Sequence, residues 1–303
     1  MKHFCGSEQT KAYFEGWYCK HQNGAHTVAL IPALHLDGEG RGTASIQVIT
    51  ETGAGNVRFP AQAFSAHENR FSVRVGDNLF CERGIRVNLH AGALSVRGTL
   101  RYGPFSPPRG DVMGPFALLP AMQCRHRVVS LRHTLAGRLW LNGEPIDFSG
   151  GTGYLEGDRG TSFPRRYLWS QCNRFAREDC CVMLSVAEIP IAGTIFPGCI
   201  CCVLWRGREL RLATYLGARP LWWDETGAAV AQGKLLLLAE PLRQAAQPLY
   251  APSHGAMSRV IRESAAAAVR YRLYEGGRLV FDLTGETAGF EFSEEEKSRC
   301  NLV

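Results

Sequence analysis

Polar and apolar residues alternate one by one through much of this chain, and short turns separate the alternating runs. Residues 71–75 alternate before a turn at 76–78, and residues 85–89 repeat the pattern before Gly92. Successive side chains of a strand point to opposite faces, so this period indicates half-buried strands. The 33 Gly and 15 Pro are spread without a three-residue period, as expected for many short segments joined by turns. The pattern predicts an all-β fold and argues against a helical bundle.

Hairpin turns support the same prediction in both halves of the chain. Residues 139–141 lead into Asn142-Gly143, and this pair readily adopts the positive φ angles of a type I′ turn. Similar turns interrupt residues 204–214 and 269–282. Residues 257–268 fit either a short amphipathic helix or a strand, and residues 294–297 predict a terminal helical turn.

The length of the chain suggests how these strands are grouped. Strand-rich halves of about 150 residues match the size at which an antiparallel sheet closes into a barrel around one cavity. The 303 residues therefore predict two consecutive antiparallel β-barrels with few short helices, at residues 1–160 and 161–303.

Charge and hydropathy exclude several partners. The 34 basic and 28 acidic residues give a net charge of +6, but the basic residues are scattered singly, so we expect no nucleic-acid surface. The first residues contain no apolar segment typical of a signal peptide, which predicts a cytoplasmic protein. Residues 189–205 carry no charge, yet their two prolines and two glycines favour two buried strands over a membrane-spanning helix.

No cofactor motif is present, and the eleven cysteines show none of the usual zinc spacings. Reduced cysteines pack as small buried hydrophobes, although Cys199 and Cys201 would share a strand face and leave a thiolate metal site as the alternative. Residues 151–157 approach a dinucleotide-binding fingerprint, but Glu156 replaces its third glycine. We expect neither a metal nor a cofactor.

A dense polar and aromatic segment at residues 147–173 carries a family resemblance. Its run of Tyr-x-Glu-x-Asp-x-Gly-x-Ser-Phe-Pro, continued by Trp-x-Gln-x-Asn, resembles the central signature of the tocopherol cyclase family. Residues 13–20 resemble the amino-terminal motif of that family, and residues 113–116 and 124–130 resemble further segments of its bacterial members. A weaker similarity lies at 288–291. The motifs occur in the family's order.

The resemblance implies both a fold and an activity. It implies two lipocalin-like barrels, as in the more distantly similar carotenoid hydratases, and a cofactor-free isomerase that closes a prenylated hydroquinone into a chromanol. The partner would be a hydrophobic isoprenoid molecule, collected by transient contact with a membrane. The chain departs from the family pattern at Gly157 and Arg159, where Lys and Trp are usual, and at Cys19, where an aromatic residue is usual.

Such a cyclisation needs an acid strong enough to protonate an alkene. A buried carboxylic acid meets this need, because desolvation disfavours its anion and raises its pKa. Glu156 and Asp158 share one face of a predicted strand, and Glu156 is the preferred acid. The alternative is that both carboxylates form ion pairs with Arg159, Arg165 or Arg166.

A row of large polar and aromatic residues is predicted to bind the substrate. Tyr167, Trp169, Gln171 and Asn173 alternate onto one strand face, where rings can stabilise a cation and amides can orient a hydroxyl. Tyr154 is assigned the same role. The alternative is a packed core between the barrels with hydrogen-bonded amides.

His126 is predicted to be the base that accepts the phenolic proton. The neighbouring Arg125, Arg127 and Arg132 would lower its pKa and keep the imidazole neutral. A structural, hydrogen-bonded histidine is the alternative.

Trp17 and Tyr18 complete the predicted binding residues. Trp17 could instead close one end of a barrel against an arginine, as large aromatic residues mostly serve packing. Two other functions use the same cavity: a lipid or quinone carrier without chemistry, and a hydratase in which water traps the cation. The sequence names neither the substrate nor an oligomeric state.

Overall fold

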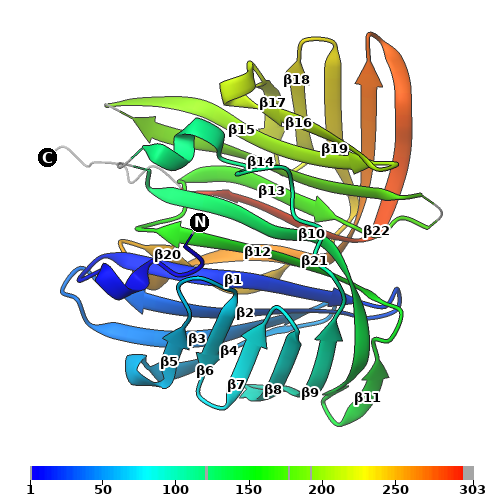
Figure 1. Cartoon of the computed structure of the whole chain (residues 1–303). Coiled ribbons are helices and arrows are strands. Elements are labelled where there is room, and N and C mark those ends of the chain that lie inside the picture. The colour runs from blue at the N-terminus through cyan, green and yellow to red at the C-terminus, as the bar shows by residue number, and fades with distance from the viewer. Residues whose placement is uncertain (1, 120–121, 177, 192, 296–303) are drawn as a thin grey trace, which may run out of the picture.

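The computed structural model describes residues 2–119, 122–176, 178–191 and 193–295. It confirms the all-β prediction, because two large antiparallel sheets make up the molecule (Figure 1). The helical elements are short 3₁₀ turns, η1 (Gly6–Glu8), η2 (Ala61–Ala63), η3 (Gly114–Leu118) and η4 (Thr214–Leu216). No helix in the described ranges is long and apolar enough to cross a membrane.

The first sheet contains all the strands before residue 161. They are β1 (Tyr13–Gln22), β2 (Thr27–Leu36), β3 (Gly42–Thr50), β4 (Ala54–Pro60), β5 (Phe64–Ala66), β6 (Ser72–Val75), β7 (Asn78–Cys81), β8 (Gly84–Ala91), β9 (Leu94–Tyr102), β10 (Cys124–Leu141), β11 (Glu144–Asp147) and β12 (Thr152–Gly160). Their order is β4-β3-β2-β1-β12-β10-β9-β8-β7-β6-β5, and β11 pairs with β10. The sheet thus places β1 beside β12, the first strand beside the last.

The second sheet contains all the strands after residue 161. They are β13 (Arg166–Cys172), β14 (Cys180–Ile191), β15 (Thr194–Trp205), β16 (Arg208–Ala213), β17 (Arg219–Asp224), β18 (Gly227–Gln232), β19 (Leu235–Arg243), β20 (Gln247–Ser253), β21 (Ala256–Glu275) and β22 (Arg278–Glu294). Their order is β16-β15-β14-β13-β22-β21-β19-β18-β17, with β20 paired to β21. Here too the first strand, β13, lies beside the last, β22.

Both sheets curl around a core of their own. In the first, β4 approaches β8 so closely that a Cβ on Gly55 would lie 2.3 Å from the carbonyl oxygen of Ala91. In the second, the Gln232 side chain joins β18 to β16, accepting from the Ala213 amide at 3.0 Å and donating to the Arg211 carbonyl at 3.1 Å. Each curved sheet encloses a separate cluster of buried apolar side chains.

Strands β1, β12 and β13 are buried on both faces because the two sheets pack against each other. One face of each strand points into the core of its own sheet, as Trp17, Leu155 and Leu168 do. The alternate residues face the other sheet, where Tyr18, Tyr154 and Trp169 join a third buried cluster. The period-two pattern therefore serves two buried surfaces in these strands.

Most local predictions agree with the structure. Asn142 and Gly143 have φ angles of 52° and 91° in the turn between β10 and β11, and residues 189–191 and 194–205 lie in the β14–β15 hairpin. The strands are confirmed there, but their predicted burial holds only from Gly198 onward, because Pro190, Ile195 and Pro197 are exposed. Residues 257–268 belong to a strand, β21, which settles the choice between helix and strand. The predicted terminal helical turn is wrong at Glu294, which ends β22, and residues 296–297 lie outside the described part of the chain.

The cysteines follow the packing prediction. Ten cysteines are free within the described ranges, and seven of them are buried. Cys199 and Cys201 lie in the core of the second sheet among apolar side chains. Within the described residues, no group of cysteines is placed to hold a metal ion.

Candidate functional site

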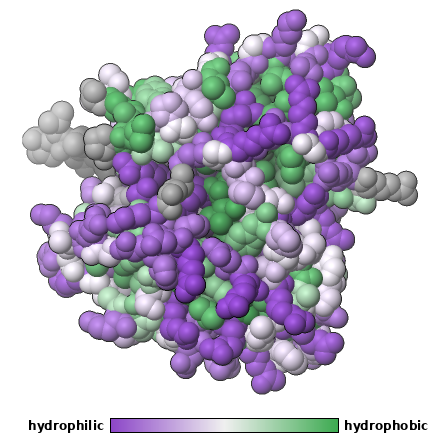
Figure 2. Space-filling view, in the orientation of Figure 1, coloured by the Kyte–Doolittle hydropathy of each residue, from purple (hydrophilic) through white to green (hydrophobic). Residues whose placement is uncertain are grey.

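A cavity of about 180 Å³ lies between the two sheets. Its wall is mainly apolar and comes from both sheets and from η3, with Phe14, Ile31 and Phe116 among the contributing side chains. The surface face in Figure 2 is largely hydrophilic, with smaller hydrophobic areas showing between the two halves. The polar groups on the cavity wall are few, and they include four carboxyl groups, those of Glu156, Asp158, Glu263 and Glu291.

Glu156 is the best-connected of these carboxyl groups. It lies on β12 with 4% of its surface exposed. Its Oε2 accepts a hydrogen bond from the Tyr154 hydroxyl at 2.5 Å and another from the Trp169 indole N–H at 3.2 Å. The Trp169 bond crosses from the second sheet to the first, so packing of the sheets fixes the position of this carboxyl.

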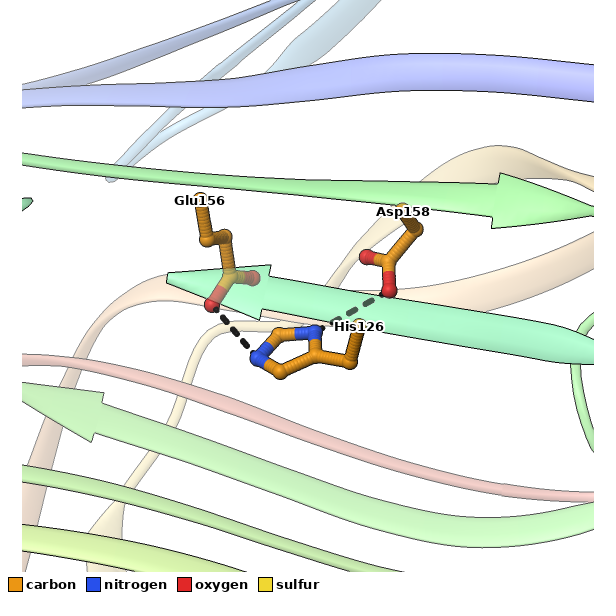
Figure 3. Close-up of side chains that lie close together, drawn as sticks. All are labelled: His126, Glu156 and Asp158. Carbon is orange, nitrogen blue, oxygen red and sulfur yellow. Dashed lines mark hydrogen bonds and ion pairs between the residues drawn. The ribbon is translucent and has the colours of Figure 1, made fainter. Parts of the chain in front are cut away.

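His126 lies between two carboxyl groups, as Figure 3 shows. Its Nδ1 is 3.0 Å from Asp158 Oδ1, and its Nε2 is 3.4 Å from Glu156 Oε2. His126 and Asp158 are Cα partners of β10 and β12, and residues paired across antiparallel strands place their side chains on one face. The sheet register therefore builds this row of three residues.

Burial and neighbouring charges shift the pKa of both partners upward. Burial raises the pKa of Glu156 to about 7, because the benefit of the nearby His126 only partly offsets the loss of solvent. Burial alone would lower the pKa of His126, but Asp158 and Glu156 outweigh it and raise that pKa to about 9. At neutral pH, His126 is an imidazolium and a substantial fraction of Glu156 carries its proton.

The prediction that arginines lower the pKa of His126 is therefore wrong. Arg125 donates to the Leu119 carbonyl, Arg127 donates to the carbonyls of Lys2 and His3, and Arg132 pairs with Asp179. Residues adjacent in a strand point away from each other. The carboxyl across the strand pair, and not the arginine next in sequence, sets the charge of His126.

The alternative pairing of Glu156 and Asp158 with arginines is not what the structure contains. Arg165 lies 3.9 Å from Glu295 and Arg166 lies 3.5 Å from Glu294, both at the edge of the second sheet. The carboxyl groups pair with His126 instead.

Four of the predicted binding residues line the cavity, and three of them, Tyr18, Tyr167 and Trp169, also contact its carboxyl groups. Tyr18 and Trp169 meet edge to face with ring centroids 5.3 Å apart. Tyr18 donates to Glu263 at 2.5 Å, and Tyr167 donates to Glu291. These aromatic residues thus connect the cavity wall to its carboxyl groups.

The remaining predicted residues of that strand face do not line the cavity. Gln171 and Asn173 meet Lys20 and Gln22 of β1, and we call these four residues the polar cluster. Lys20 donates to the Thr287 carbonyl at 2.7 Å and to Gln171 at 3.4 Å. Gln22 donates to Asn173, which donates in turn to the Gly153 carbonyl at 2.8 Å.

Tyr154 also lies outside the cavity wall, and its hydroxyl donates to Glu156.

Trp17 belongs mainly to the core of the first sheet. It packs against Phe4, Phe64 and Phe71, and it is also one of the residues that line the cavity. A Cβ placed on Gly157 would lie 3.2 Å from the Trp17 ring and 3.4 Å from the Arg127 guanidinium. The glycine that departs from the family pattern thus leaves room for this Trp and Arg, which agrees with the alternative of a packing role for Trp17.

Sequence reasoning missed Glu263 and Glu291 as site residues. Glu291 ends the weakly similar segment at 288–291, and Glu263 closes an alternating run at 257–263. The family similarity at 288–291 and the alternation at 257–263 marked these segments, but neither pattern showed that Glu263 and Glu291 are paired across β21 and β22.

His126, Glu156 and Asp158 form the one group within the described residues whose ligand atoms all lie within 4.8 Å of one another. A metal ion would need these atoms to converge on one point. The imidazole instead separates the two carboxyl groups and faces one with each nitrogen (Figure 3). The arrangement suits protons shared along a row better than a metal ion.

Comparison with known proteins establishes the fold. No family model and no curated protein sequence matches this chain. A solved structure from Nitrosomonas europaea, described as a candidate AttH protein, has 14% identity and a TM-score of 0.55, covering 92% of each chain. Kievitone hydratase from Nectria haematococca has 10% identity and a TM-score of 0.54, covering 93% of this chain and 89% of its own.

These two proteins share the all-β, two-sheet fold of this chain. At such low identity the likeness extends to the fold alone, and the resemblance to the tocopherol cyclase family stays a prediction.

Proposed function

We propose that this protein is an acid-catalysed isomerase that closes a prenylated hydroquinone into a chromanol, in the cavity between its two sheets. One observation carries the proposal. Glu156 is a buried carboxyl on the wall of a mainly apolar cavity, and burial raises its pKa to about 7. It is therefore able to hold a proton at neutral pH and to give it up within an apolar site.

The chemistry begins with proton transfer from Glu156 to the trisubstituted alkene of the prenyl chain. Positive charge then develops on the more substituted carbon. The Trp169 and Tyr18 rings at the cavity wall can stabilise such a cation by roughly 0.5–2 kcal/mol each. Attack by the phenol oxygen forms the C–O bond and releases the phenol proton, so the reaction is redox-neutral and consumes no cofactor.

His126 is suited to restore the acid between turnovers. Its Nε2 faces Glu156, and both His126 and Asp158 also border a second cavity of about 20 Å³, which Arg125 and Arg159 line as well. A proton taken up there can pass from the imidazolium to Glu156 without crossing the apolar cavity. This role as a donor replaces the predicted role of His126 as a base.

The test is to incubate the protein with a prenylated benzoquinol and to look for the chromanol. Cyclisation leaves the mass unchanged, so the product is separated by chromatography before mass spectrometry. Glu156→Gln should lower the rate by roughly 10²–10⁴-fold, the usual contribution of a general acid. Glu286→Gln, whose side chain is exposed on β22, is the matched control and should keep full activity.

Two other outcomes would replace this function by another. Substrate retained by the wild-type protein without any product, and equally retained by Glu156→Gln, identifies a carrier. A product heavier by one water identifies a hydratase, in which water traps the cation. The fold shared with kievitone hydratase is compatible with that chemistry.

Exposed apolar side chains suggest how a hydrophobic substrate could reach the cavity. Leu118 is 84% exposed and Ile195 is 59% exposed. Each is close in sequence to one of two rings, Phe116 and Phe196, whose centroids are 6.4 Å apart, and Phe116 lines the cavity. We expect Leu118→Asp to reduce co-sedimentation with phospholipid vesicles. Leu279→Asp is the control: it makes the same change at an exposed leucine of β22 and should not reduce co-sedimentation.

A further inference from the structure

Two buried glutamates on the second sheet have no part in the mechanism above. Glu263 and Glu291 are 3% and 6% exposed, and both line the cavity. They are Cα partners on β21 and β22, so their side chains lie on one face about 5 Å apart at Cβ. Like charges placed directly opposite destabilise a strand pair. The sheet tolerates this pair most readily when one of the two carboxyl groups keeps its proton and is uncharged.

Each of these carboxyl groups has one engaged oxygen and one free oxygen. Tyr18 donates to Glu263 Oε1 and Tyr167 donates to Glu291 Oε1. The hydrogen bonds of the described residues reach only the Oε1 atoms, and neither Oε2 atom is among the fully enclosed polar atoms that lack a partner. Because both residues line the cavity, these oxygens are open to it, and a ligand with hydroxyl groups can donate hydrogen bonds to them.

The groups that face Glu263 and Glu291 give the two carboxyl groups different pKa values, so one ionises more readily than the other. Burial raises the pKa of Glu263 to about 7, with Tyr18 and Lys20 lowering it and Glu156 raising it. Burial raises the pKa of Glu291 well above its usual range, and Glu263 raises it further, while Tyr167 and Arg259 act against this shift. Glu291 therefore keeps its proton and Glu263 is the member that ionises.

We propose that Glu263, beside a protonated Glu291, binds the ring hydroxyl of the hydroquinone and accepts its proton as the new ring closes. This assignment rests on the function proposed above and adds the base for that reaction. Glu156 belongs to the first sheet and Glu263 to the second, so the acid and the base approach one substrate from the two walls of the cavity.

The proton balance of the step is complete. The proton of Glu156 forms a C–H bond at the alkene, and the phenol oxygen forms the C–O bond at the cation. The phenol O–H bond breaks and its proton goes to the Glu263 carboxylate. Once the chromanol leaves, Glu263 loses this proton to water, His126 passes its proton to Glu156, and the imidazole takes a proton back from water. Water thus gains one proton and gives one, and the protein returns to its starting state.

Binding of head groups without a prenyl chain tests the assignment apart from catalysis. The probes are a methylated benzene-1,4-diol and its bis-methyl ether, and the dissociation constants follow from quenching of tryptophan fluorescence. A hydrogen bond to a charged group contributes about 1.5–3 kcal/mol, so the wild-type protein should bind the diol at least about 10-fold more tightly than the ether. Glu263→Gln should reduce this preference below about threefold.

Matched variants keep the result unambiguous. Glu156→Gln and Glu286→Gln should retain the preference for the diol, and thermal unfolding of each variant shows that it is folded. Tyr18→Phe, which keeps the carboxyl and removes only the hydroxyl that donates to it, should retain the preference at pH 8. Equal binding of diol and ether by the wild-type protein, or loss of the preference in Glu156→Gln alone, would overturn the assignment.

The pH dependence gives a second readout that a purely structural role would not move. The preference for the diol should grow from pH 6 to pH 8 as Glu263 ionises. Lys20→Met removes a positive charge that lowers the pKa of Glu263 and should shift this rise to higher pH. An unshifted rise in Lys20→Met contradicts the assignment. If Glu263→Gln keeps the preference for the diol while the wild-type protein forms chromanol, the role of Glu263 is overturned and the proposed function stands. If the wild-type protein prefers the diol through Glu263 but forms no chromanol, the proposed function is overturned and the binding role of Glu263 stands.

Discussion

The two ends of the surface between the sheets differ sharply, although the same strands build both. At one end, alternate residues of β1, β12 and β13 enclose a cavity with Tyr18, Glu156 and Trp169 on its wall. At the other end, β1 and β13 with the residue that follows it bring together the polar cluster, which joins the sheets by hydrogen bonds. Strand alternation decides which residues face the other sheet, and the opposing side chains decide whether a cavity forms there.

The difference predicts that the two ends affect different properties. Substitutions of the uncharged members of the polar cluster should change the free energy of unfolding and leave the chemistry of each folded molecule intact. Lys20 is the exception, because its charge also lowers the pKa of Glu263. Substitutions at the cavity end should change the pH dependence of activity and leave unfolding nearly unchanged. Four predictions test this division.

The largest effect is expected for Asn173→Ala. This substitution leaves the Gly153 carbonyl and the Gln22 amide without their partners, and a buried unsatisfied group costs about 1–3 kcal/mol. We expect a loss of about 2–4 kcal/mol in the free energy of unfolding, measured by urea denaturation, with an unchanged rate per folded molecule. Asn69→Ala, at an exposed loop, is the control.

A stability loss in Asn173→Ala no greater than in Asn69→Ala would show that the polar cluster does not hold the sheets together.

Lys20→Met should change how stability depends on pH. Burial lowers the pKa of Lys20 from 10.5 to about 8. Between these values the unfolded chain holds a proton that the folded protein has released, so this residue makes stability rise with pH. The variant lacks that rise. The unfolding free energy of the wild-type protein should therefore improve relative to the variant by about 2 kcal/mol between pH 7 and pH 10.

A constant difference between the two proteins across this range would mean that Lys20 titrates normally in the folded state.

His126→Gln should move the alkaline limb of the activity profile upward. The acid form of Glu156 is active, so the rate falls as pH rises through the pKa of about 7. The imidazolium lowers that pKa, and its removal should raise the midpoint by roughly 1 pH unit. His90→Gln, on the exposed face of β8, should leave the profile in place, and a downward shift in His126→Gln would contradict the charge assigned to His126.

The smallest effect is expected for Trp169→Phe. The ring remains at the cavity wall, but Glu156 loses the indole N–H that donates at 3.2 Å. Because this bond lowers the pKa of Glu156, the alkaline limb should move upward by less than in His126→Gln. The free energy of unfolding should change by no more than about 1 kcal/mol. A larger loss would mean that Trp169 mainly stabilises the packing of the two sheets, as the polar cluster does.

The sequence was sufficient for the fold class and for the faces of the strands. Alternation and turn residues predicted strands in both halves. The predicted shared face is present for Tyr167, Trp169 and Gln171 of β13, and Asn173, directly after this strand, bonds to β1 as Gln171 does. What alternation does not contain is the identity of the opposing strand. Tyr167 and Trp169 line the cavity, whereas Gln171 and Asn173 meet Lys20 and Gln22, and this follows from how β1 packs across β13.

The charges that surround His126 also follow from the register of the strands. In the sequence two arginines, Arg125 and Arg127, flank His126, but its partner across the sheet is the acidic Asp158. Glu263 and Glu291 are paired across β21 and β22, where the register shifts more than once. A shift of one residue turns a side chain to the other face, so the sequence alone did not identify this pair.

The cavity joins strands from the two extremes of the chain. Tyr18 and Glu263, which share a hydrogen bond across the cavity wall, are separated by 245 residues. During synthesis the first sheet can fold while the second is still being made, because chains fold from the amino terminus as they emerge. Its outward face, with Tyr18, Lys20 and Glu156, then waits for β21 and β22. A nascent chain halted before these strands exposes that incomplete polar surface to solvent, and the protein acquires its site only once β21 and β22 have been made.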